Sequence, residues 1–169
     1  YIEKYFEFMQ TPRIIDSPIE PTVVPIDPTP PVIEFRNVSF KYPGNKRLIL
    51  NGFNLTINPG EKVALVGENG AGKTTLIKLL LRFYDVSEGE ILINGVNIKQ
   101  VDLEKVYGQV GALFQDFIKY QFTFKENVYL GNLKHSDNLE LLKQAIDQSG
   151  ADEVVRDLPG KYDQVMGKM

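Results

Sequence analysis

The sequence predicts an α/β fold, in which a parallel sheet with flanking helices carries an additional antiparallel β portion. Three observations predict it. Strand patterns crowd the first half of the globular part, and helical patterns follow them. Two continuous apolar runs have the character of strands buried in a parallel sheet. Between the first of these runs and a helical pattern lies a glycine-rich stretch that ends in Lys-Thr.

The first 31 residues are not expected to belong to a core. Residues 1–9 place four apolar side chains on one helical face, namely Ile2, Tyr5, Phe6 and Met9. Prolines crowd residues 17–31, which predicts an extended, semi-rigid linker, because proline fixes φ and removes a hydrogen-bond donor. We therefore divide the chain into a helical end at 1–16, a linker at 17–31 and a globular part at 32–169.

Strands are expected at residues 33–40 with one irregularity, around 55–57, at 62–66, at 90–93 before the tight turn Asn94-Gly95, and at 110–114. The runs at 62–66 and 110–114 are the two that predict buried parallel strands. Helices are expected at residues 75–84, 125–130, 139–148 and 152–156. The core stripe expected on the first of these helices comprises Leu76, Leu79, Leu80 and Phe83.

Residues 67–74 read Gly-Glu-Asn-Gly-Ala-Gly-Lys-Thr, a complete G-x-x-x-x-G-K-[ST] phosphate-binding pattern. Its glycines let successive backbone N–H groups point at a phosphate, and the following helix adds its positive dipole end. Lys73 is expected to reach the β- and γ-phosphates, and the Thr74 hydroxyl to ligate Mg²⁺. Thr75 either assists at the α-phosphate or caps the first helical turn. The predicted contacts to a nucleoside triphosphate are Gly67, Asn69, Gly70, Ala71, Gly72, Lys73, Thr74 and Thr75.

Composition narrows the function classes. A chain of 169 residues with 43% hydrophobic residues has material for one domain with a sizeable core. The net charge of −3 gives no general basic surface for nucleic acid, and the absence of cysteine excludes disulfides and thiolate metal sites. The one histidine, His135, lies in a polar stretch and is expected to be an exposed loop residue.

Several further motifs stand in a fixed order around the phosphate loop. Phe40-Lys41-Tyr42-Pro43 precedes it, Gly60-Glu61-Lys62 leads into it, and Gln115 ends the next apolar run. Thr123 to Gly131 and Leu158 to Asp163 follow. In this order the motifs resemble the ATP-binding domain of ABC transporters, of the exporter type in which membrane and nucleotide domains share one polypeptide. The resemblance covers residues 32–169 and implies an ABC-ATPase-like P-loop NTPase fold.

The resemblance implies further roles. Tyr42 would stack on adenine, although plain strand packing is the alternative. Gln115 would contact Mg²⁺ and its bound water and would act with Lys73 in catalysis. Gln115 would also sense the state of the membrane domain. The implied ligands are ATP and Mg²⁺, and the implied partners are the membrane domain and a second nucleotide-binding domain in a head-to-tail dimer. The implied location is the cytoplasmic face of the cell membrane, where residues 1–16 would lead from the membrane domain. No nucleic-acid partner is expected.

The LSGGQ signature and the later Asp-Glu pair of that family do not occur within residues 1–169. We therefore expect the chain to be the N-terminal part of such a domain, incomplete at its C-terminus and weak in hydrolysis alone. Without the strand that carries the acidic pair, Val63 to Val66 are expected to expose apolar side chains. A soluble ABC-type ATPase acting on ribosomes or DNA is the alternative function. A kinase or GTPase is disfavoured, because no N-K-x-D base-reading motif is present.

Overall fold

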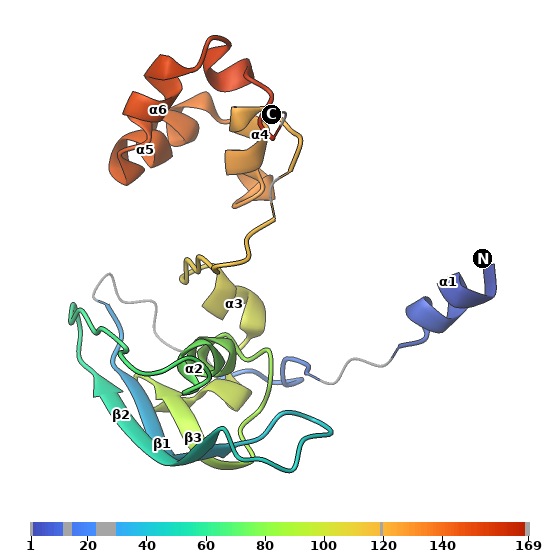
Figure 1. Ribbon diagram of the computed structural model, residues 1–169, viewed down its shortest axis with the longest axis vertical. Helices are drawn as coiled ribbons and strands as arrows, with labels where there is room; N and C mark the ends of the chain where they lie inside the picture. The colour runs from blue at the N-terminus through green and yellow to red at the C-terminus, as the bar shows by residue number, and fades with distance from the viewer. Residues whose placement is uncertain (1, 12–14, 23–29, 119, 168–169) are drawn as a thin grey trace. The chain divides into compact units, whose positions relative to one another are not determined.

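The computed structural model describes residues 2–11, 15–22, 30–118 and 120–167 (Figure 1). Residues 12–14 of the predicted helical end, and Pro25 and Pro28 of the predicted linker, lie outside the described residues. The chain divides into two compact units, Tyr1–Gly111 and Ala112–Met169.

The first unit is built on a four-stranded antiparallel sheet. Its strands are β1 (Ile33–Phe40), β2 (Leu50–Ile57), β3 (Glu88–Ile93) and β4 (Val96–Asn97), and their order in the sheet is β2-β1-β3-β4 (Figure 1). The predicted strands at 33–40, 55–57 and 90–93 are therefore confirmed, and β2 begins earlier than predicted. The sheet is the antiparallel β portion that the sequence predicts.

The predicted irregularity in the first strand is a bulge at Asn37. The register of β1 shifts between Phe35 and Val38 on its β2 side, and Asn37 has a φ of 51°. Gly89 on β3 lies against this bulge. A Cβ at position 89 would lie 2.3 Å from the carbonyl oxygens of Arg36 and Asn37, so only glycine fits there.

The turn Asn94-Gly95 closes the β3–β4 hairpin. Ile93 pairs with Val96, and the two turn residues have φ values of 50° and 76°. Two positive φ values in a two-residue loop are typical of a type I′ turn, for which Asn-Gly is the preferred sequence. The local prediction of a tight turn is confirmed.

Helix α2 (Lys73–Leu80) packs against the sheet. The core combines its Leu76 and Leu79 with apolar side chains of the strands and of the following turn, namely Phe35, Val38, Phe40, Leu50, Ile91 and Ile98. The helix ends earlier than predicted, because Arg82 adopts a φ of 50° and donates from Nε to Asp85 over 3.0 Å. Phe83 was placed in the core stripe by the helical period, and this is wrong: its side chain is half exposed, because it follows the helix end.

Two predicted strands do not form. Residues 62–66 and 110–114 have no strand assignment, and Val66 and Leu113 are 94% and 88% exposed. A parallel strand needs neighbouring strands to satisfy its backbone and helices to cover its faces. In the described part of the chain, the four strands of the sheet pair only with one another, so neither segment has a neighbouring strand. Val63, Leu65 and Val66 are exposed as expected.

The segment between β4 and the second unit contains two elements that the sequence did not predict. They are a 3₁₀ turn η1 (Ile98–Gln100) and helix α3 (Leu103–Tyr107), and the Asp102 side chain caps α3 by accepting from Glu104 N–H over 3.0 Å. The Ser17 hydroxyl accepts from Leu103 N–H over 3.1 Å, so this end of the predicted linker contacts the start of α3.

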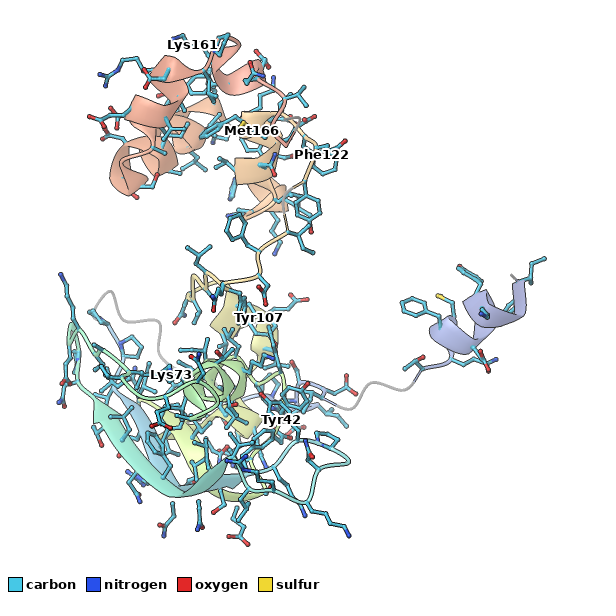
Figure 2. The ribbon with its side chains drawn as sticks, in the orientation of Figure 1. Tyr42, Lys73, Tyr107, Phe122, Lys161 and Met166 are labelled. Atoms are coloured by element: carbon cyan, nitrogen blue, oxygen red, sulfur yellow. The ribbon has the colours of Figure 1, made fainter. Side chains whose placement is uncertain are left out.

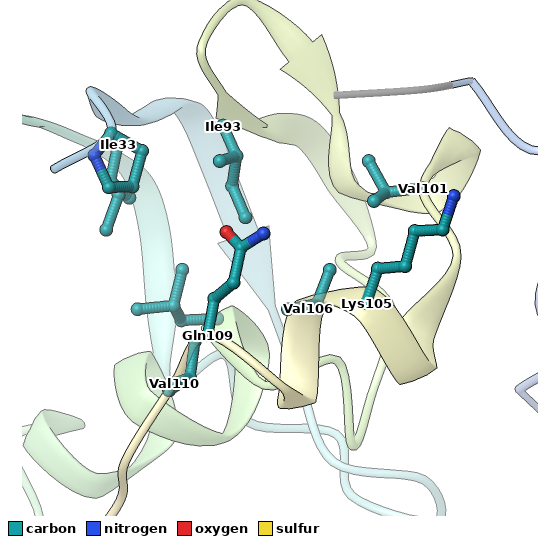
Figure 3. Close-up of a pocket in the computed structure, with 9 residues that line it drawn as sticks. Ile33, Ile93, Val101, Lys105, Val106, Gln109 and Val110 are labelled. Carbon is teal, nitrogen blue, oxygen red and sulfur yellow. The ribbon is translucent and has the colours of Figure 1, made fainter. Parts of the chain in front are cut away.

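An apolar cavity of about 80 Å³ lies beside α3 (Figure 3). It is lined by Pro31, Ile33, Leu80, Ile93, Val101, Val106 and Val110, with Lys105 and Gln109 among them. Leu80 is the last residue of α2, whereas the phosphate-binding pattern ends within the first turn of that helix. The cavity is therefore separate from the candidate phosphate site, and its apolar lining does not suit a phosphate.

The predicted N-terminal helix forms as α1 (Ile2–Met9). Among the described residues, no helix has both the length and the apolar character needed to cross a bilayer.

The second unit is helical. It comprises α4 (Phe124–Tyr129), the 3₁₀ turn η2 (Leu133–His135), α5 (Leu139–Ser149), α6 (Asp152–Asp157) and the 3₁₀ turn η3 (Lys161–Asp163). The three predicted helices are confirmed, and His135 is exposed as expected. A small core forms around Leu142, Ile146 and Val155.

Candidate phosphate-binding site

The glycine-rich pattern forms a tight loop immediately before α2. Gly70 and Gly72 have φ values of 86° and 92°, which L-residues adopt only with strain. Ala71 N–H donates to the Glu68 carbonyl over 3.2 Å and closes a turn within the loop. At Gly72 space is limited as well, since a Cβ would lie 3.2 Å from side-chain carbons of Ile49 and Leu50. The backbone conformation therefore requires glycine at both positions, and Ile49 and Leu50 add a limit of space at Gly72.

Lys73 is held by the loop itself. Its Nζ donates to the carbonyl oxygens of Gly67 and Glu68 over 2.6 and 2.8 Å. The ammonium group thereby lies beside the loop backbone, where it offers a positive charge to an anion that the loop surrounds.

The N-terminus of α2 lacks a side-chain cap. Gly72 is the N-cap residue and no side chain accepts from the first turn, while Leu76 N–H donates to the Gly72 carbonyl over 3.0 Å. The N–H groups of the preceding helical residues have no intrahelical acceptor by geometry, and they lie at the positive end of the helix dipole. Thr74 is exposed in this turn. Loop, lysine and helix end together supply the donors that a chain of phosphates requires.

Thr75 does not cap this turn, so one of the two roles left open for it is wrong. Its hydroxyl oxygen lies 3.0 Å from the Tyr42 hydroxyl, and the residue is only 5% exposed. Phe40 and Tyr84 pack against the same tyrosine ring with centroid distances of 5.0 and 5.1 Å. Tyr42 thus contacts α2 two residues after Lys73, and Figure 2 shows the side chains of Tyr42 and Lys73 in the first unit.

The side chains near the loop could hold Mg²⁺ only if phosphate oxygens supplied further ligands. Within the described ranges, no group of three or more His, Asp or Glu side chains is placed to hold a metal ion. Mg²⁺ commonly takes one or two protein ligands and completes its shell with phosphate oxygens and water. The exposed Thr74 hydroxyl at the start of α2 suits such a role.

Gln115 lies in the second unit and is exposed, in a turn with Asp116. The structure therefore brings together Tyr42, residues 67–74 and Thr75, whereas the role of Gln115 at a metal stays a prediction.

The segment after Gln115 is anchored by a capping box on α4. The Thr123 side chain accepts from Glu126 N–H, and the Glu126 carboxylate accepts from the Thr123 backbone N–H and hydroxyl over 2.8 and 2.7 Å. The Thr123 hydroxyl, and then its backbone N–H, hold the pKa of Glu126 below its usual value. Asn127 Nδ2 donates to the carbonyl oxygens of Tyr120, Phe122 and Thr123. Glu126 and Asn127 therefore hold the start of α4 and the backbone just before it.

Three neighbours of the site could not be predicted from the sequence. Tyr84 packs on Tyr42, Lys78 Nζ lies 5.8 Å from the centre of the Tyr42 ring, and Ile49 limits the space at Gly72. Each contact joins residues that are distant in the chain. Of the three, only Lys78 could have been suspected from the sequence, because it lies on the helix that follows the loop.

Comparison with known proteins shows the family of the chain. The family model described as "ABC transporter" matches residues 50–166. The chain therefore belongs to the ABC transporter family. It is 38% identical over 99% of its length to the subtilin transport ATP-binding protein SpaT of Bacillus subtilis. It is 35% identical, again over 99%, to the putative multidrug export ATP-binding/permease protein YgaD of Bacillus subtilis (strain 168).

A solved structure of a bacterial Atm1-family ABC exporter with ATP bound aligns with 99% of the chain at a TM-score of 0.82 and 31% identity. The chain covers 29% of that exporter, and 27% and 28% of the two Bacillus relatives. The ABC-ATPase fold class predicted from the sequence is confirmed.

Proposed function

We propose that this chain is the ATP-binding part of an ABC exporter, and that the intact protein hydrolyses ATP to drive export of a substrate across a membrane. The observation that carries the proposal is the Lys73 ammonium, held by two loop carbonyls at the start of an uncapped helix. Family membership supports it, as do the printed names of the relatives, which include export and permease functions.

The residues divide the work of binding. The backbone N–H groups of residues 67–75 surround the phosphates, and the Lys73 ammonium neutralises charge on the β- and γ-phosphates. The Thr74 hydroxyl would be one protein ligand of Mg²⁺, which would supply positive charge beside the phosphates. Tyr42 presents its ring to adenine, an interaction supported by its proximity to α2 through Thr75. The side-chain amide oxygen of Gln115 would be a second protein ligand, a role that rests on the family resemblance.

The remaining predictions concern the intact protein. We propose that residues 1–16 lead from a membrane domain through the linker at 17–31 to the ATP-binding domain at 32–169, on the cytoplasmic face. Support comes from relatives named as ATP-binding/permease proteins. A second nucleotide-binding domain would complete the site head to tail. The proposed contact with the membrane domain is Gln115 and the segment that follows it to Tyr120, where Phe117, Tyr120 and the neighbouring Phe122 are exposed.

The soluble alternative, an ABC-type ATPase acting on ribosomes or DNA, has less support. The named relatives belong to transport and export proteins, and the chain has a net charge of −3 and no general basic surface.

Phosphate release by the full-length protein in lipid nanodiscs tests the proposal. We expect ATP hydrolysis that requires Mg²⁺ and that falls to background in Lys73→Ala, with Lys62→Ala, an exposed lysine just before the loop, as the matched control. Hydrolysis that persists unchanged in Lys73→Ala would contradict the assignment of the site.

A further inference from the structure

The Tyr42 hydroxyl makes a directional contact with the phosphate-loop helix. Its oxygen lies 3.0 Å from Thr75 Oγ1, in a partly buried position, and Thr75 is the third residue of α2. Helical threonines commonly direct their hydroxyl to the carbonyl four residues earlier. The recorded partner here is Tyr42, 33 residues away. The bond thus links the loop that follows β1 directly to α2.

The other contacts of the ring restrict it without fixing it. Phe40 and Tyr84 meet Tyr42 at interplanar angles of 79° and 89°, an edge-to-face arrangement on both counts. Such aromatic contacts have broad minima, whereas a hydrogen bond constrains both distance and angle. The hydroxyl pair is therefore the contact that sets the ring's place relative to the helix.

We propose that Thr75 is a positioning residue, whose hydroxyl holds the Tyr42 ring ready for the base while the neighbouring backbone takes the phosphates. The inference rests on the proposed function, because it assumes that Tyr42 stacks on adenine. If the Tyr42 ring is already held in place, its side chain loses little conformational entropy when ATP binds. Ordering one free side chain costs about 0.5–1.5 kcal/mol, which corresponds to a two- to tenfold change in affinity.

The test compares two ligands on the full-length protein: ATP, and inorganic tripolyphosphate, which has no base. Thr75→Val and Tyr42→Phe each remove one hydroxyl and keep the shape of the side chain. We expect each to weaken ATP about two- to tenfold and to leave tripolyphosphate affinity unchanged. The double variant should be no weaker than either single variant, and Thr75→Ser should restore ATP affinity, since it keeps the hydroxyl.

Tyr107→Phe is the matched control. Its hydroxyl donates to the Leu81 carbonyl over 3.0 Å in the same unit, so the variant loses a comparable bond outside the site. It should leave both affinities unchanged, which separates positioning from a general loss of stability.

Three outcomes would overturn the inference: unchanged ATP affinity in both single variants, additive losses in the double variant, or equal losses for ATP and tripolyphosphate. Tyr42→Ala distinguishes these failures from a failure of the proposed stacking. If Tyr42→Ala weakens ATP and the hydroxyl variants do not, only the positioning role is wrong. If Tyr42→Ala leaves ATP affinity unchanged, the stacking itself is wrong, and the positioning role falls with it.

Discussion

Replacing Gly72 by alanine perturbs the loop in two ways that the structure separates. Gly72 has a φ of 92°, and its added Cβ would lie 3.2 Å from carbons of Ile49 and Leu50. The left-handed conformation costs about 1–2 kcal/mol in an L-residue, and inserting a methyl into a packed site costs about 1–3 kcal/mol. We therefore expect Gly72→Ala to destabilise the domain by about 2–5 kcal/mol.

Gly70→Ala is the matched control. Gly70 has a φ of 86° and no atom within 4 Å of its added Cβ, so it incurs only the conformational cost of about 1–2 kcal/mol. Thermal melting of the domain within the full-length protein measures the difference, at roughly 2–4 °C for each kcal/mol in a domain of this size. Equal melting temperatures for the two variants would refute the argument that Ile49 and Leu50, at the start of β2, limit the space at Gly72.

Two further predictions concern the second unit. The Thr123 hydroxyl, and then the Thr123 backbone N–H, hold the pKa of Glu126 below its usual value, so these bonds contribute stability above the unfolded-state pKa and lose it as pH falls through the folded-state pKa. Thr123→Val should move the Glu126 pKa upward in an NMR titration of the carboxyl group, and an unmoved pKa would contradict the capping argument. Cysteine at the 71% exposed position of Ile118 should cross-link to the membrane domain of the intact transporter, and products confined to other surfaces would oppose the proposed contact.

The sequence predicted best those elements whose cause is local. The Asn94-Gly95 turn follows from the φ values that a two-residue hairpin demands, and the helix at 124–129 begins at a capping box between Thr123 and Glu126. Each signal lies within a few residues, so no knowledge of the remaining fold was needed.

The predictions that failed depend on neighbours from elsewhere. Residues 62–66 and 110–114 have the composition of buried strands, but a strand exists only where another strand pairs with it. Phe83 continues the helical period of α2, yet Arg82 ends that helix in a left-handed conformation. Periodicity does not reveal such a stop.

The candidate site likewise has one part that the local sequence predicts and another that depends on distant residues. The loop is contiguous, so its backbone geometry could be predicted from its glycines and Lys73. The contact between Tyr42 and Thr75 spans 33 residues and depends on how α2 packs on the sheet. Neither the bond nor the packing of Tyr84 on the same ring is encoded in any local pattern.

Calorimetric titration of the full-length protein with MgATP tests the central claim most directly. Loss of the Lys73 ammonium removes a charge-assisted contact of about 1.5–3 kcal/mol, so Lys73→Ala should bind MgATP at least tenfold more weakly than the wild type, while Lys62→Ala binds it normally. Equal affinity of Lys73→Ala and the wild type would contradict the assignment of residues 67–75 as the ATP site.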